Sequence, residues 1–125
     1  MSDGDPPTRP LSKPVVDPLN TVCWFGMDAC WLLGFAGPAY LAAGLTVLSG
    51  LVLLALGWRR GWGERLADLG LNGWIAMNTV WCVCDLSGRP VPRPLAGTLA
   101  AVGAGCILAA AWHSQDLRRL RITRR

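Results

Sequence analysis

Apolar residues along this chain form four long blocks, which are separated by short segments rich in proline, glycine or charge. The blocks cover residues 18–35, 38–58, 69–86 and 94–112. Each block is close to the roughly 20 residues that an α-helix needs to cross about 30 Å of hydrocarbon. The pattern therefore predicts an all-α integral membrane protein, a four-helix bundle made of two transmembrane hairpins.

The segments outside these blocks are polar and indicate the limits of the domain. Residues 1–16 are rich in proline, which predicts a disordered or extended tail. Asp17 and Pro18 are suited to be the N-cap and the first residue of a helix, so we expect the transmembrane domain to cover residues 17–112. Residues 113–125 form a basic tail.

The distribution of charge predicts the topology. Hydrophobic residues make up 52% of the chain and charged residues only 16%, which is unlike a soluble globular domain. Of the 12 basic residues, all but Arg89 and Arg93 fall in the two tails or in the loop between the second and third blocks. The positive-inside rule then places both termini in the cytoplasm, with the bacterial inner (plasma) membrane as the expected location. Because the basic tail directly follows a spanning helix, we expect it to contact anionic lipid headgroups and not nucleic acid.

Two stretches of the chain share the pattern Trp-x-x-Met-[Asp/Asn]-x-x-Trp. Positions i, i+3, i+4 and i+7 lie on one face of a helix, so each stretch forms a single stripe. The stripes are Trp24, Met27, Asp28 and Trp31 in the first block, and Trp74, Met77, Asn78 and Trp81 in the third. The repeat predicts two similar hairpins, with Asp28 and Asn78 at similar depth near the middle of the membrane.

Polar residues make the first and third blocks marginal as membrane spans. We therefore expect these two helices to form the interior of the bundle, and the second helix to face lipid or another subunit. The fourth block carries small residues at i+4 spacing, which permit close approach of a neighbouring helix or of a second copy of the chain. These residues are Gly97, Ala101, Gly105 and Ala109.

Asp28 is the residue most expected to carry a function, because ionisable residues inside membranes mark functional sites. It needs a hydrogen-bond partner, a cation or a proton, and Asn78 is the expected partner. The four Trp side chains could then hold an organic cation or stack on a flat ligand such as a quinone. The structural alternatives are an Asp–Asn bond that joins two helices and Trp side chains that only pack.

Asp85 lies seven residues after Asn78 and therefore on the same helical face. It could extend a polar path outward from Asp28. A local ion pair with Arg89, four residues further on, is the favoured interpretation.

The remaining reactive side chains indicate no metal site and no cofactor. The five cysteines include no C-x-x-C pair, and His113 is the single histidine. The chain also lacks a plausible nucleophile–base pair, so we do not expect an enzyme.

The Trp-based motifs resemble those of small bacterial four-helix membrane proteins of unassigned function. In that group Trp-x-x-x-Asp-x-x-Trp in the first helix is followed by Trp-x-x-x-Asn-x-x-Trp in the third, with an acid four residues later. The matching positions here are Trp24, Asp28, Trp31, Trp74, Asn78, Trp81 and Asp85. In that group the acid after the third-helix motif is usually a Glu followed by an aromatic residue, whereas this chain has Asp85 followed by Leu86. The resemblance implies the fold and the importance of these positions, and no activity.

Together these features predict a membrane protein with a site formed by Asp28, Asn78 and the Trp residues. The site would bind a small ligand or join the protein to a homo-oligomer or a larger membrane assembly. The alternative is a small proton- or cation-coupled transporter with Asp28 as the titrating group.

Overall fold

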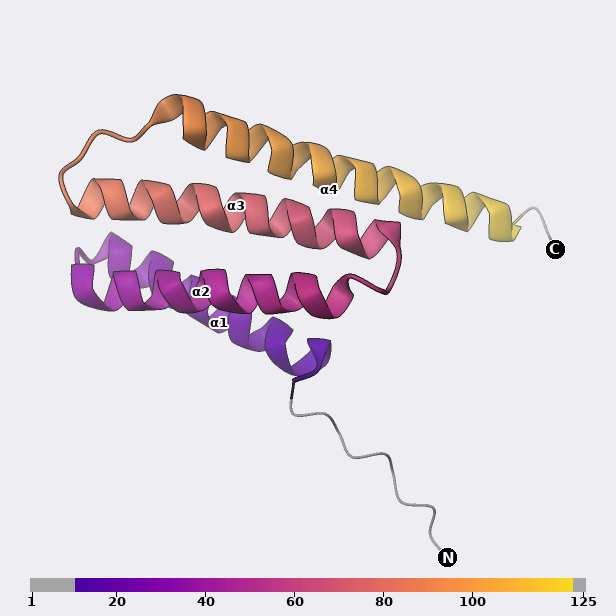
Figure 1. Cartoon of the computed structure of the whole chain (residues 1–125), viewed down its shortest axis with the longest axis horizontal. Helices are drawn as coiled ribbons and strands as arrows, with labels where there is room; N and C mark the ends of the chain where they lie inside the picture. Colours follow the sequence, from indigo (N-terminus) through magenta and orange to yellow (C-terminus); the bar gives the residue numbers. More distant parts are fainter. Residues whose placement is uncertain (1–10, 123–125) are drawn as a thin grey trace, which may run out of the picture.

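A computed structural model describes residues 11–122, with side chains described through residue 115. This part of the chain is entirely helical: α1 (Lys13–Leu32), α2 (Ala36–Gly57), α3 (Trp62–Leu86) and α4 (Arg93–Ile122). The helices alternate in direction, so the start of α1, the α2–α3 turn and the end of α4 lie at one end of the molecule (Figure 1). The predicted all-α, four-helix architecture is confirmed. Two segments, Ala36–Gly57 and Arg93–Gln115, are long and apolar enough to cross a membrane by length and composition.

The first helix begins earlier than the sequence pattern predicted. Ser12 is its N-cap, in an extended conformation, and Pro14 lies in the first turn. Backbone N–H groups in the first turn have no acceptor within the helix, so proline, which lacks an N–H, fits there without loss of a hydrogen bond. Pro18 lies inside the helix, so the predicted start at Asp17 is wrong. The tail predicted to be disordered covers residues 1–16, and its residues 1–10 lie outside the described part of the chain.

The third and fourth helices are also longer than predicted. Because α3 begins at Trp62, most of the charged loop before residue 69 is helical. The fourth helix continues through the basic tail as far as Ile122, since residues 113–122 contain neither proline nor glycine to end it. Arg124 and Arg125 lie outside the described residues.

The two odd-numbered helices end in the same way. Gly34 and Gly88 have φ values of 73° and 67°, which glycine adopts without the steric cost of a Cβ atom. After α1, the N–H groups of Gly34 and Phe35 donate to the carbonyls of Trp31 and Cys30, at 3.0 and 2.8 Å. Gly88 and the residue after it make the equivalent bonds at the end of α3, at 3.2 and 2.8 Å. Both ends are Schellman motifs, which satisfy carbonyl groups that a helix end otherwise leaves free.

The order of packing differs from the expected arrangement. The second helix packs against both α1 and α3, and α4 packs against α3. The prediction of an interior place is therefore confirmed for α3 and wrong for α1, because α2 and α3 are the helices with two large interfaces. The packed face of α2 is made mostly of small residues, which explains its central place. The buried residues of α2 are Ala39, Ala43, Thr46, Gly50, Leu53 and Gly57.

Glycines allow α3 and α4 to approach closely. A Cβ atom on Gly70 would lie 2.8 Å from the carbonyl oxygen of Gly103, and one on Gly73 would lie 3.1 Å from the Gly103 Cα. The glycines of the small-residue stripe make no close helix contact within the described residues, since a Cβ on Gly97 or Gly105 would meet no atom within 4 Å.

Candidate functional site

Residues from α1 and α3 line an open pocket of about 590 Å³. Its lining comprises Asp28, Trp31, Leu32, Asn78 and Asp85. Leu32 and Asp85 belong to the last turns of their helices, so the pocket lies at the end of the bundle opposite the start of α1 and the end of α4. We call it the acidic pocket. It contains three of the polar residues that the sequence indicated.

One hydrogen bond in this pocket joins α1 to α3. The indole Nε1 of Trp31 donates to a carboxylate oxygen of Asp85 at 2.8 Å. The expected ion pair between Asp85 and Arg89 is wrong, since the ion pairs in the described part of the chain are those of Lys13. Arg89 lies beyond the turn at Gly88, where the helical i, i+4 spacing no longer holds.

Asp28 and Asn78 line the same pocket but do not bond to each other. Within the described residues, the Asp28 carboxylate accepts no hydrogen bond, and it is exposed. Asp28 lies four residues before the end of α1 and Asn78 lies eight before the end of α3. This difference is one helical turn, or about 6 Å. The predicted direct hydrogen bond between Asp28 and Asn78 is therefore wrong, and Asn78 lies one turn further from the end of its helix than Asp28 does.

The four motif Trp residues do not surround a single site. Trp31 lines the acidic pocket, and Trp24 lines a smaller pocket of about 210 Å³ that also contains Asp28. Trp74 and Trp81 are 44% and 47% exposed. Trp81 lies about 60° around α3 from Asn78, by helical geometry, and borders a groove shared with α4.

The core behind the acidic pocket is small and apolar. Met27, Ala39, Ala43 and Cys82 form a buried cluster, so α1, α2 and α3 meet there. The indole nitrogen of Trp24 and the hydroxyl of Thr79 are buried without a hydrogen-bond partner among the described residues, and nothing in the structure explains either. No group of three or more His, Cys, Asp or Glu side chains in the described residues is arranged to hold a metal ion.

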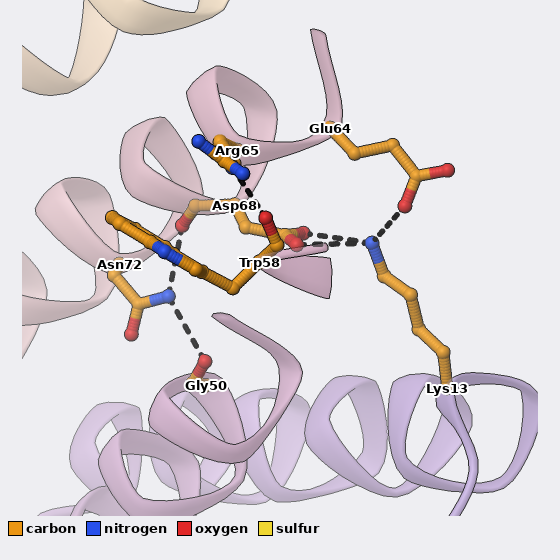
Figure 2. Close-up of polar contacts among 7 residues, drawn as sticks. All are labelled: Lys13, Gly50, Trp58, Glu64, Arg65, Asp68 and Asn72. Carbon is orange, nitrogen blue, oxygen red and sulfur yellow. Dashed lines mark hydrogen bonds and ion pairs between the residues drawn. The ribbon is translucent and has the colours of Figure 1, made fainter. Parts of the chain in front are cut away.

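A second polar group, at the other end of the bundle, was not found from the sequence. Lys13 at the start of α1 lies 3.0 Å from carboxylate oxygens of both Glu64 and Asp68 on α3 (Figure 2). Burial lowers the pKa of the Lys13 ammonium, but its hydrogen bonds and ion pairs with the two acids outweigh burial and raise the pKa overall. The available signals were the i, i+4 spacing of the two acids and a lysine shortly before the first apolar block, but all three residues lie outside the predicted helices.

Further polar contacts strengthen this end. The Asn72 amide donates to the carbonyl oxygens of Gly50 and Asp68 at 3.0 and 2.8 Å, which ties α3 to α2 (Figure 2). The Arg65 guanidinium lies 5.0 and 5.2 Å from the ring centres of Trp58 and Trp62, at cation–π distance. Polar side chains thus join α1, α2 and α3 at this end of the bundle.

No protein-family model matches the chain, no curated protein has a significantly similar sequence, and no solved structure has a significantly similar fold. The resemblance to small four-helix membrane proteins stays a prediction from the sequence.

Proposed function

We propose that this chain is a non-enzymatic integral membrane protein that binds a small organic cation in the acidic pocket. In this proposal all four helices cross the inner membrane, and both termini face the cytoplasm. The pocket then opens toward the opposite side of the membrane.

The distribution of apolar side chains supports insertion of the whole bundle. Large apolar residues on every helix are exposed, among them Phe25, Leu48, Trp81 and Leu108, which are 73%, 60%, 47% and 70% exposed. An exposed apolar surface of this extent is typical of a surface covered by lipid. Two helical segments, Ala36–Gly57 of α2 and Arg93–Gln115 of α4, are long and apolar enough to cross a membrane.

Two amide side chains, one on α1 and one on α3, form hydrogen bonds to α2. Asn20 on α1 is buried and donates to the Thr46 carbonyl and the Ser49 hydroxyl of α2, at 3.0 and 2.8 Å. The Asn72 amide of α3 makes one corresponding bond, to the Gly50 carbonyl of α2 at 3.0 Å. Such interhelical bonds allow a marginal helix to stay in a membrane. They support membrane insertion of α1 and α3 as part of the bundle.

Placement of the basic residues supports the orientation. The ends of the helices that carry Lys13, Arg59, Arg60 and Arg65 lie together with the C-terminal end of α4. Among the basic residues in the part of the chain that the structure describes, Arg89 and Arg93 lie at the end with the acidic pocket. The positive-inside rule assigns the first end to the cytoplasm.

A cationic ligand follows from the lining of the acidic pocket. Asp28 and Asp85 bring two carboxyl groups to one open cavity, and Trp31 brings an indole ring whose orientation is fixed by its bond to Asp85. Carboxylates and an aromatic ring together are the groups that bind organic cations. The exposed Asp28 carboxylate, which accepts no hydrogen bond from the described residues, is the observation that carries the proposal.

The test is binding of benzyltrimethylammonium to the purified protein in lipid nanodiscs, followed by calorimetry. We expect Asp28→Asn to weaken binding about tenfold, the effect of losing roughly 1.4 kcal/mol. Asp17→Asn is the matched control, because Asp17 is an exposed acid of α1 near the opposite end of the helix. Equal binding by wild type and Asp28→Asn, or equal loss in both variants, would contradict the proposal.

A coupled transporter is the second candidate, favoured because the Asp28 carboxyl is open to exchange protons or cations from one side. Proteoliposomes that contain wild type or Asp28→Asn distinguish the two functions. Proton or cation flux in wild type that disappears in a folded, inserted Asp28→Asn protein would establish transport. Binding without flux would leave a ligand-binding or accessory protein.

A further inference from the structure

A second cavity of about 680 Å³ lies between α3 and α4, at the same end of the bundle as the acidic pocket. We call it the α3–α4 groove. Its walls come from two helices and from the turn that joins them. They consist of Met77 and Trp81 on α3, Pro90 and Val91 in the turn, and Arg93, Ala96, Gly97 and Ala100 on α4.

We propose that the α3–α4 groove binds one anionic phospholipid from the leaflet that faces away from the cytoplasm. An acyl chain lies along the groove, and Arg93 holds the phosphate. The inference rests on the proposed insertion in a membrane, and it is independent of any ligand in the acidic pocket.

The shape and lining of the groove suit an acyl chain. Ala96, Gly97 and Ala100 project at most a methyl group from α4, and a Cβ atom on Gly97 would meet nothing within 4 Å. Met77 and Trp81 cover the opposite wall with large, polarizable side chains. The result is an apolar channel that a flexible hydrocarbon chain can fill.

The charge of the groove selects the headgroup. Arg93 is the only charged residue among those that line it, and Arg93 makes no ion pair within the described residues. A guanidinium binds a phosphate through two parallel hydrogen bonds. Arg93 is the first residue of α4, next to a turn stiffened by Pro90, so it lies at the mouth of the groove and not along its apolar length.

Native mass spectrometry of the detergent-purified protein tests the proposal. Dioleoylphosphatidylglycerol is the anionic probe, and dioleoylphosphatidylcholine is the zwitterionic comparison. We expect wild type to retain one phosphatidylglycerol in preference to phosphatidylcholine. Arg93→Gln should reduce retention about fivefold, as expected for one basic residue near a lipid headgroup. Gly97→Leu should reduce it by filling the groove.

Each variant has a matched control. Arg89→Gln removes the neighbouring arginine, which does not line the groove, and Ala101→Leu adds the same side chain one turn further along α4, outside it. Both controls should retain lipid as wild type does. Equal retention of the two lipids by wild type, or equal losses in Arg89→Gln and Arg93→Gln, would overturn the proposal. A chain that fails to fractionate with membranes would instead refute the proposed function.

Discussion

Trp31 and Asp85 occupy equivalent positions, each three residues before the glycine that ends its helix, and a 2.8 Å hydrogen bond joins them. The Trp-based motifs are offset by 50 positions, from Trp24 to Trp74, whereas the helix ends are offset by 54, from Gly34 to Gly88. The third helix therefore has one extra turn after its motif. That turn moves Asn78 deeper into the bundle and brings Asp85 level with Trp31.

Replacing Trp31 should loosen the contact between α1 and α3 at the acidic pocket. Trp31→Phe keeps an aromatic ring but removes the donor to the Asp85 carboxylate, so we expect the unfolding free energy to fall by about 1 kcal/mol. Thermal unfolding in nanodiscs measures the change. Trp81→Phe is the control, since the Trp81 side chain makes no hydrogen bond within the described residues. A Trp31→Phe protein as stable as Trp81→Phe would show that the bond contributes nothing.

The close contact of α3 with α4 should tolerate no added methyl group. The Cβ atom in Gly70→Ala would lie 2.8 Å from the Gly103 carbonyl oxygen, so we expect a loss of about 1–3 kcal/mol from overpacking. Denaturant titration of the purified protein provides the measurement. Gly105→Ala introduces the same methyl group into open space on α4 and should leave stability unchanged or slightly higher. Comparable losses in both variants would argue against this helix interface.

The Lys13 ion pairs predict a pH dependence of stability. The pKa of Lys13 is raised in the folded protein above its usual 10.5, so the ion pairs contribute fully below pH 10.5 and are lost as the pH rises through the folded-state pKa. Lys13→Met leaves the nearly buried Asp68 carboxylate unpaired and should cost about 2 kcal/mol at neutral pH.

Thermal unfolding between pH 8 and 12 checks this expectation. The stability gap between wild type and Lys13→Met should close at the alkaline end, where the wild-type amine also becomes neutral. Lys13→Arg keeps its charge across this range, so any gap between it and Lys13→Met should persist. A wild-type advantage that does not change with pH would mean that Lys13 acts through packing alone.

The proposed topology predicts opposite accessibility at the two ends of the bundle. Ser87 and Ser114 are both exposed, Ser87 just after α3 and Ser114 near the other end of α4. In a background without the native cysteines, Ser87→Cys should react with a membrane-impermeant maleimide in spheroplasts. Ser114→Cys should react only after lysis. Labelling of both positions in spheroplasts, or of neither, would refute the four-span arrangement.

The pattern of apolar blocks was sufficient to predict the number and order of the helices. It misplaced the start of α3 at Trp62 and the end of α4 at Ile122, because both helices continue into charged segments outside the apolar blocks. A helix can extend beyond its apolar block, because hydropathy reports burial in lipid and not the continuity of backbone hydrogen bonds.

The candidate site was predicted in part. Its polar members, Asp28, Asn78 and Asp85, do line one pocket. The Asp28–Asn78 bond, the Asp85–Arg89 pair and the single Trp-walled site were wrong. Sequence periodicity shows which residues share a face of one helix, but the relative depth and rotation of two helices depend on their packing. Here both α1 and α3 pack on α2, and this sets which of their residues meet.

The small residues on the packed face of α2 allow α1 and α3 to lie close to each other. Because Ala43, Gly50 and Gly57 add little width, α1 and α3 come close enough for side chains to bond across both ends, at Lys13 and at Trp31. The Lys13 ion pairs and the Trp31–Asp85 hydrogen bond therefore both depend on the distance between α1 and α3. A ligand that spreads the helices at the acidic pocket would also strain the ion pairs on the opposite side, about 27 Å away by the helical rise from Lys13 to Trp31.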